Sequence, residues 1–143
     1  MSQQARSIRA VVFDLDDTLY GERAYVRSGY RAVAEKLRGL SGRDEPFDAW
    51  LWRRFLAGEA TGALDALNDQ FRLGLSSDQI AELVRVYREH RPAIRPYDGL
   101  PALLGRLHER YQLALLSDGF LPAQKLKLEA LKLERFFDAV VFT

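Results

Sequence analysis

The sequence feature that most constrains this chain is a short apolar run followed at once by acidic residues. It reads Ala10-Val-Val-Phe-Asp14-Leu-Asp16-Asp17-Thr18. An unbroken apolar run of this kind predicts a strand that is buried in a sheet. Carboxylates this close together repel one another unless a cation, backbone N–H groups or a reaction compensates their charge. The pattern therefore favours a functional site at the end of the strand, although an acidic turn in which Asp17 or Thr18 caps a helix is a simpler interpretation.

A second apolar run ends in a hydroxyl residue. It reads Leu113-Ala-Leu-Leu-Ser117-Asp118-Gly119 and predicts another buried strand. Taken alone, this pattern is equally typical of a strand that closes on a serine before an Asp-Gly turn. A third run, Ala139-Val-Val-Phe, predicts one more strand near the end of the sequence.

The sequence between the first two runs has the spacing of helices throughout. We expect four helices there, over about 23–38, 47–56, 63–71 and 76–90. Gly39 to Pro46 interrupts the first of these patterns, and Ser76-Ser-Asp-Gln79 forms a capping box at the start of the last. A further leucine stripe between Leu100 and Leu107 predicts the helix that leads back to the second strand.

The order of these elements predicts an α/β fold. Strands that alternate with helices imply a parallel sheet with right-handed crossovers, and such sheets bind ligands at the carboxyl ends of their strands. Asp14 and Ser117 both stand at such ends. We therefore expect the two side chains to meet in space.

The two strand ends resemble the first and second motifs of the haloacid dehalogenase-like superfamily, most of whose members are magnesium-dependent phosphatases. Residues 124–142 are similar to the helix and third strand that follow in members with a cap after the first motif. The resemblance covers nearly the whole chain. It implies a split Rossmann-like three-layer core over residues 1–20 and 96–143, incomplete because it lacks the C-terminal strands, and an inserted C1-type cap of four helices over residues 21–95.

The resemblance also implies a role for each motif residue. Asp14 would be the nucleophile that forms an aspartyl-phosphate. Asp16 would protonate the leaving alcohol and later deprotonate the attacking water. The implied cofactor is Mg²⁺, held by the Asp14 side chain and the Asp16 backbone carbonyl. The phosphoryl oxygens would be bound by the Ser117 hydroxyl and by the backbone N–H groups of Leu15, Asp118 and Gly119.

Asp16 bears on the type of reaction. Dehalogenase members displace halide, which needs no proton, and they lack an aspartate at this position, whereas a departing alkoxide needs a proton. A phosphatase that acts on a small phosphorylated metabolite is therefore favoured over a dehalogenase, and a phosphomutase would share both aspartates. The alternative from another class is a catalytically dead module that binds a phosphorylated ligand or a partner protein.

Two further motifs of the superfamily are not visible, namely a lysine shortly after the third strand and an acidic pair at the end of the next strand. Lys125, Lys127 and Lys132 precede the third strand and match the helix lysines of the family instead. Loss of a charge-stabilising donor typically costs about 3–4 kcal/mol. We therefore expect a C-terminally truncated fragment with low or no activity by itself. We also expect residues 11–13 to form an open sheet edge that invites self-association or a partner chain.

The composition excludes several other classes of protein. The 21 basic residues are scattered among 20 acidic ones, for a net charge of +1, which leaves no footprint for nucleic acid. The absence of cysteine excludes disulfides and zinc-thiolate sites. No stretch is apolar enough to span a membrane, and Met1 to Arg9 lacks the apolar core of a signal peptide, so we expect a cytoplasmic location.

Overall fold

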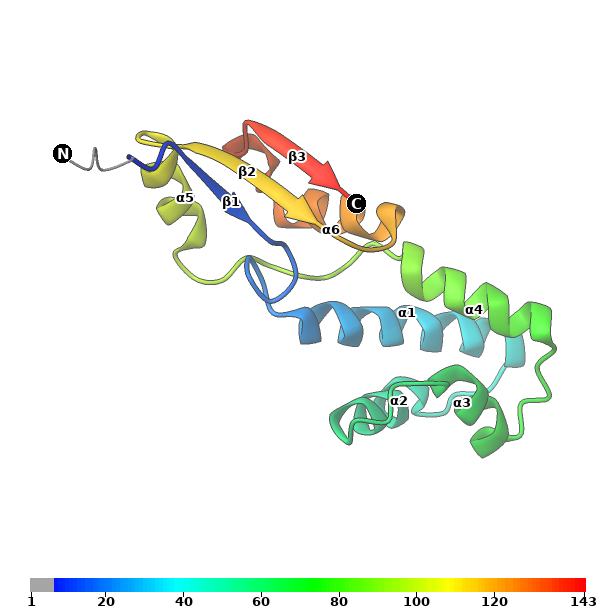
Figure 1. Cartoon of the computed structure of the whole chain (residues 1–143). Coiled ribbons are helices and arrows are strands. Elements are labelled where there is room, and N and C mark those ends of the chain that lie inside the picture. Colours follow the sequence, from blue (N-terminus) through cyan, green and yellow to red (C-terminus); the bar gives the residue numbers. More distant parts are fainter. Residues whose placement is uncertain (1–6) are drawn as a thin grey trace. The chain divides into compact units, whose positions relative to one another are not determined.

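The computed structural model describes residues 7–143, and the chain divides into two compact units (Figure 1). Unit 1 comprises the residues up to Glu22 together with Ile94–Thr143, and unit 2 comprises Arg23–Ala93. The prediction that Met1 to Arg9 is not a signal peptide concerns in part residues 1–6, which lie outside the described residues. Each unit has its own hydrophobic core.

Unit 1 is built on a parallel sheet of three strands. These are β1 (Ala10–Phe13), β2 (Gln112–Ser117) and β3 (Ala139–Phe142), in the spatial order β1-β2-β3. Phe13 lies opposite Leu115, and Ser117 lies opposite Phe142. The predicted α/β fold with a parallel sheet is confirmed.

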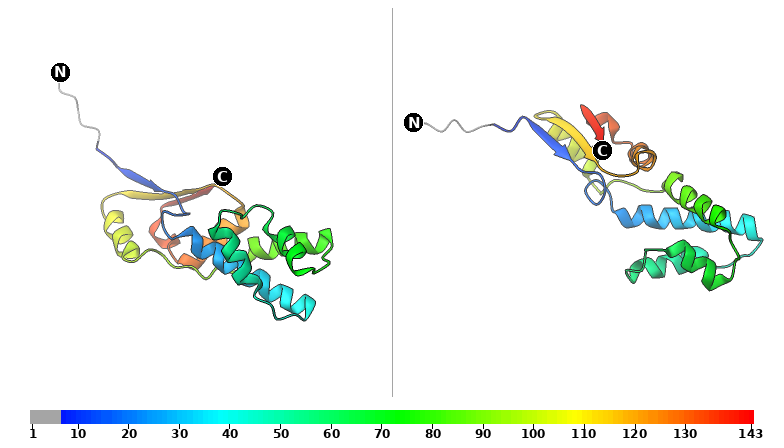
Figure 2. Two further views of the ribbon diagram at one scale, coloured as in Figure 1. Left: turned by 90° about the horizontal axis from the view of Figure 1, so that it is seen from below. Right: turned by 45° about the vertical axis from the view of Figure 1, so that its right-hand side comes forward.

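Two helices cover one face of this sheet. They are α5 (Leu100–His108) and α6 (Leu121–Leu131), and a short 3₁₀ helix, η1 (Glu134–Phe136), follows α6. Both lie on the same side of the strands (Figure 2) because right-handed crossovers that step in one direction along a sheet place their helices on one face. Leu113 and Leu115 point to that side and are 0% exposed.

The opposite face of the sheet is not buried, which differs from the expectation for β1. Val12 is 61% exposed, and Leu116 and Val141 are 47% and 48% exposed. Val12 stands opposite Ala114, and Leu116 stands opposite Val141, so these side chains form one apolar surface. No helix among residues 7–143 covers it, and within those residues β1 pairs only with β2. The described core of unit 1 therefore has one helical layer rather than the two of a three-layer fold.

Unit 2 consists of helices. They are α1 (Glu22–Ser41, whose first residue belongs to unit 1), α2 (Phe47–Leu56), α3 (Ala63–Phe71) and α4 (Ser77–Glu89). The bounds of α2 and α3 agree with the predicted ones. The predicted capping box also forms, because the Gln79 N–H donates to Ser76 Oγ at 3.2 Å and the Ser76 N–H donates to Gln79 Oε1 at 2.9 Å. Val33, Leu37, Leu51, Leu67 and Leu83 form the centre of the core at 0% exposure.

The first helix is longer than predicted. It continues through Gly39, where an interruption was expected, and ends at Ser41. Gly42 follows with φ at +66°, a left-handed conformation that stops a helix and that glycine adopts without strain. Ser41 Oγ donates to the Leu37 carbonyl at 2.7 Å. The stop signal is therefore Gly42, since a single glycine within a helix weakens it without ending it.

Across residues 7–143, no helix is both long and apolar enough to cross a membrane.

Candidate active site

The candidate site lies at the carboxyl edge of the sheet in unit 1. Asp14 follows the last residue of β1, and Ser117 is the last residue of β2. Because Phe13 and Leu115 are in register on neighbouring parallel strands, which lie about 4.8 Å apart, both residues come to the same edge. Asp14 is exposed, and its carboxylate accepts no hydrogen bond from any residue in 7–143. The predicted nucleophile is therefore open to a ligand.

Ser117 is the group in this region that most clearly lacks a partner. Its side chain is 1% exposed, and its Oγ atom has no hydrogen-bond partner among the described residues. A buried hydroxyl without a partner costs about 1–3 kcal/mol, so native proteins seldom keep one without a reason. A phosphoryl oxygen bound at this position would supply the missing partner.

The backbone N–H groups predicted for phosphate binding differ in their availability. Those of Leu15 and Asp118 donate no hydrogen bond within the part of the chain that the structure describes. The Gly119 N–H instead donates to the Thr143 carbonyl at 3.2 Å, while the Thr143 N–H donates to the Ser117 carbonyl at 3.0 Å. Gly119 thus extends the β2–β3 ladder by one step, and its expected role in phosphate binding does not fit this arrangement.

Asp16 is held by three side chains. Its Oδ1 atom accepts hydrogen bonds from the Tyr20 hydroxyl and from Lys127 Nζ, the latter at 2.8 Å, and its Oδ2 atom accepts one from Gln124 Nε2 at 3.2 Å. Burial works to raise the pKa of Asp16, but the hydrogen bonds from Lys127, Tyr20 and Gln124 and the ammonium charge outweigh it and hold the pKa below its ordinary value. Asp16 is therefore a carboxylate at neutral pH in this arrangement.

Sequence reasoning missed these three partners of Asp16. Tyr20 is fully buried, and Gln124 and Lys127 are 3% and 6% exposed. Lys127 was assigned to the helix lysines outside the site, whereas the structure places its ammonium group in direct contact with Asp16. A signal was present: the two polar residues stand three apart in α6, in the stripe that otherwise holds Ala123, Leu128 and Leu131. A polar pair in a buried stripe needs partners.

Asp17 caps a helix, which was the simpler interpretation of this acidic segment. Its Oδ1 atom accepts a hydrogen bond at 2.8 Å from the N–H of Glu22, the first residue of α1. Its own φ is +55°, which turns the chain sharply after Asp16. The Thr18 N–H donates to the Leu15 carbonyl at 3.3 Å and closes the same turn. The acidic segment thus contains both a helix cap and a candidate active site.

The residues fit a magnesium ion of the expected kind. Among residues 7–143, no three His, Cys, Asp or Glu side chains cluster into a ready-made metal cage. Mg²⁺ does not need one, since it commonly binds through one or two protein oxygens together with water and substrate phosphate. The Asp14 carboxylate is an uncommitted hard oxygen donor. The Asp16 side chain is occupied by Lys127, which agrees with binding through its backbone carbonyl.

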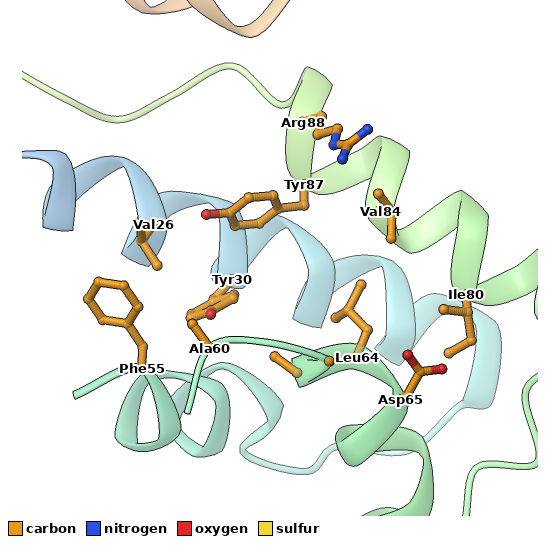
Figure 3. A pocket seen from close by; sticks show the side chains of 12 residues that line it. Val26, Tyr30, Phe55, Ala60, Leu64, Asp65, Ile80, Val84, Tyr87 and Arg88 are labelled. Carbon is orange, nitrogen blue, oxygen red and sulfur yellow. The ribbon is translucent and has the colours of Figure 1, made fainter. Parts of the chain in front are cut away.

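A pocket in unit 2 has a different character. It has a volume of about 320 Å³ and lies among α1, α2, α3 and α4 (Figure 3). Aromatic and aliphatic side chains line most of it, including Tyr30, Phe55 and Tyr87, with Asp65 and Arg88 as its charged members. None of the predicted site residues belongs to it. It is an apolar cavity of the helical unit and is separate from the site of Asp14 and Asp16.

The fold and the two strand ends define an α/β protein with a ligand site at the carboxyl edge of its sheet. Its sequence matches the profile of the haloacid dehalogenase-like hydrolases over residues 8–143. The chain belongs to this family. A comparison with curated proteins gave no match.

Solved structures with a similar fold include three from bacteria. YfnB of Bacillus subtilis, a HAD-type hydrolase solved with magnesium, is 22% identical with a TM-score of 0.60, over 96% of this chain and 64% of its own. A subfamily IA hydrolase of Geobacter sulfurreducens is 20% identical with a TM-score of 0.62, over 99% and 66%. A protein assigned as a β-phosphoglucomutase from Thermotoga maritima is 27% identical with a TM-score of 0.60, over 94% and 61%. The chain thus spans less than two thirds of the length of each.

Proposed function

We propose that this chain carries the catalytic core of a phosphatase that hydrolyses a small phosphorylated metabolite through an aspartyl-phosphate. The observation that carries the proposal is the Ser117 hydroxyl, which is buried without a partner among the described residues, at the same sheet edge as the uncommitted Asp14 carboxylate. Together they offer a nucleophile and a hydrogen-bond donor for one phosphoryl group. Membership of a hydrolase family supports the same conclusion.

The reaction would proceed in two displacements at phosphorus. Asp14 attacks the phosphorus atom, the bond to the ester oxygen breaks, and Asp16 gives a proton to that oxygen as the alcohol leaves. Asp16 is a carboxylate at rest, so it takes up this proton before the bond breaks. In the second displacement water attacks the phosphorus, Asp16 accepts a proton from that water, and Asp14 is released with inorganic phosphate.

Mg²⁺ would be held by the Asp14 side chain and the Asp16 backbone carbonyl. Bound there, the cation neutralises the charge that otherwise keeps a carboxylate away from a phosphate dianion. The residues of this chain do the rest: Ser117 and the N–H groups of Leu15 and Asp118 orient the phosphoryl oxygens.

Unit 2 would be the cap, with the predicted bounds 21–95, that selects among substrates. It is inserted in the chain between β1 and α5 and consists of helices, which supports this assignment. The cysteine-free sequence is compatible with a reducing cytoplasm, where we place the protein.

A phosphomutase is the second candidate function. It is favoured by the similarity to the Thermotoga maritima protein, the most identical of the three structures described above. The two functions differ in the fate of the phosphoryl group, since a phosphatase gives it to water and a mutase returns it to a second hydroxyl of the substrate. A dehalogenase is less well supported because halide needs no proton from Asp16.

The decisive experiment is covalent trapping of the phosphoryl group. The chain is incubated with acetyl phosphate and Mg²⁺, quenched in acid and digested, and the modified residue is identified by mass spectrometry. We expect one phosphoryl group on Asp14, none in Asp14→Asn, and unchanged labelling in Asp44→Asn, which removes a carboxylate that is 99% exposed in unit 2. Slow Mg²⁺-dependent release of inorganic phosphate from 4-nitrophenyl phosphate should follow the same pattern. Equal background in Asp14→Asn would instead favour the catalytically dead binding module.

A further inference from the structure

Two polar side chains of α6 reach the candidate site from positions one helical turn apart. Gln124 and Lys127 are among the most buried residues of this helix, at 3% and 6% exposure. An amide and an ammonium group lose free energy on burial unless each is paired. Both donate to the carboxylate of Asp16, Lys127 at 2.8 Å and Gln124 at 3.2 Å. The helix thus keeps two polar groups in its buried stripe for one carboxylate.

Gln124 also joins the two loops that carry the site. Its Nε2 atom donates to the Asp118 carbonyl at 2.5 Å as well as to Asp16, so it links the segment after β1 to the segment after β2. The chain approaches this amide closely at Gly119. A Cβ atom at that position would lie 2.7 Å from Gln124 Nε2, which is closer than real Cβ contacts allow. The Gly119 backbone therefore lies directly against the Gln124 amide, which would have to move to admit a Cβ atom.

The arrangement distinguishes the two oxygens of Asp16. A carboxylate has about four lone-pair sites, two on each oxygen. Tyr20 and Lys127 occupy both sites of Oδ1, whereas Gln124 occupies one site of Oδ2. With respect to residues 7–143, Oδ2 therefore keeps the remaining site for a group outside the protein.

We propose that Gln124 and Lys127 are positioning residues that fix the Asp16 carboxylate so that Oδ2 exchanges the proton with the leaving oxygen of the substrate. The inference rests on the function proposed above. Proton transfer requires the donor and acceptor atoms to lie within hydrogen-bond reach, and small misplacements slow it strongly. Lys127 fixes Oδ1 and Gln124 fixes the orientation of Oδ2, so the proton leaves Asp16 from one defined atom as the ester bond breaks.

The test compares two esters whose leaving groups differ in their need for a proton. 4-Nitrophenolate departs readily as an anion, whereas the alkoxide of an alkyl ester such as benzyl phosphate does not. The measured quantity is kcat/KM in the presence of Mg²⁺, because it ends with the transfer of the phosphoryl group to Asp14. We expect Lys127→Met to lower it about 100-fold for benzyl phosphate, and about 10-fold or less for 4-nitrophenyl phosphate.

Control variants separate positioning from a general loss of structure. Lys125→Met removes an exposed lysine two residues away on the same helix and should leave both esters unaffected. Lys127→Arg keeps a charged donor and should recover part of the benzyl phosphate activity. If Lys127→Met does not fold, Gln124→Leu, which removes the other donor at similar volume, is measured with the same two esters.

The outcomes are distinct. A loss that is much larger for benzyl phosphate than for 4-nitrophenyl phosphate supports the inference, and an equal loss for both esters would overturn it and leave Lys127 with a structural role only. Absence of both hydrolysis and Asp14 labelling in the unmodified chain would overturn the proposed function, and this inference with it.

Discussion

Lys127 and Asp16 are separated by 111 positions in the sequence, yet Lys127 Nζ lies 2.8 Å from Asp16 Oδ1. The two side chains are only 7% and 24% exposed, so the pair is largely shielded from water. A surface ion pair contributes little to stability, but removal of one partner from a buried pair leaves a charge without compensation. The contact therefore makes the stability of unit 1 depend on a residue pair at its candidate active site.

We expect Lys127→Met to destabilise the chain by about 1–3 kcal/mol, because it leaves the Asp16 carboxylate partly buried without its cation. The double variant Asp16→Asn with Lys127→Met should recover most of this loss, since neither charge remains. Urea unfolding followed by circular dichroism measures both effects. If the double variant lost as much unfolding free energy as Lys127→Met and Asp16→Asn lose together, the two residues would not be coupled.

Gly119→Ala should lower the free energy of unfolding by more than the strain of its backbone conformation alone accounts for. Its φ is +135°, and the new Cβ would lie 2.7 Å from Gln124 Nε2. Gly99→Ala is the matched control, because Gly99 also has a positive φ, at +78°, but a Cβ at Gly99 would meet nothing within 4 Å. We expect the control to lose about 1–2 kcal/mol of unfolding free energy from backbone strain and Gly119→Ala to lose more. Similar losses in both variants would show that the Gln124 contact contributes nothing.

The glycines of α1 provide a comparable test for unit 2. A Cβ at Gly29 would lie 2.5 Å from the Tyr87 ring, whereas a Cβ at Gly39 meets nothing within 4 Å. Gly39→Ala should therefore stabilise the helix by about 0.5–1 kcal/mol through its better helix propensity. Gly29→Ala should destabilise unit 2, since α1 and α4 must move apart to admit the methyl group. Thermal unfolding of the two variants should shift in opposite directions.

Acid should weaken unit 1 partly through Asp138. His108 Nε2 lies 3.0 Å from Asp138 Oδ1, and the Leu113 N–H donates to Oδ2 at 2.8 Å. These hydrogen bonds, that of His108 first, hold the pKa of Asp138 below its ordinary value of 3.8. Because the pKa of Asp138 is lower in the folded state, this carboxylate stabilises the fold at pH values above its ordinary pKa. The contribution is lost as the pH falls through the lowered pKa. Asp138→Asn should therefore flatten the acid limb of the stability profile, while Asp44→Asn should leave it unchanged.

The exposed face of the sheet leads to a prediction about association. Val12, Leu116 and Val141 form an apolar surface without charge, and β1 has a free edge within the described residues. Surfaces and edges of this kind promote pairing between chains. We expect copies of this chain to self-associate as its concentration rises, and Val141→Lys to shift the sedimentation profile towards the monomer. Leu56→Lys, at a residue that is 54% exposed in unit 2, should have no such effect.

Much of the fold could be predicted because its signals are local. The bounds of α2 and α3, and the capping box of α4, follow from residues that are neighbours in the sequence. The position of Asp14 and Ser117 at the same edge of the sheet was expected from two apolar runs that each end in a polar residue, whereas the register of the two strands was not predicted. The length of α1 was not predicted, because Gly39 and Gly42 look alike in the sequence and only the second adopts a positive φ.

The sequence by itself determined the parallel α/β core, the helical insert and the strand ends that carry Asp14, Asp16 and Ser117, because periodicity and strand termini are properties of adjacent residues. Only the tertiary structure decided which side chains surround Asp16 and which face of the sheet is left uncovered. Lys127 follows Asp16 by 111 positions, and a lysine on a helix resembles any solvated lysine until the fold buries it. Burial and pairing depend on contacts between distant segments, and no local pattern records them.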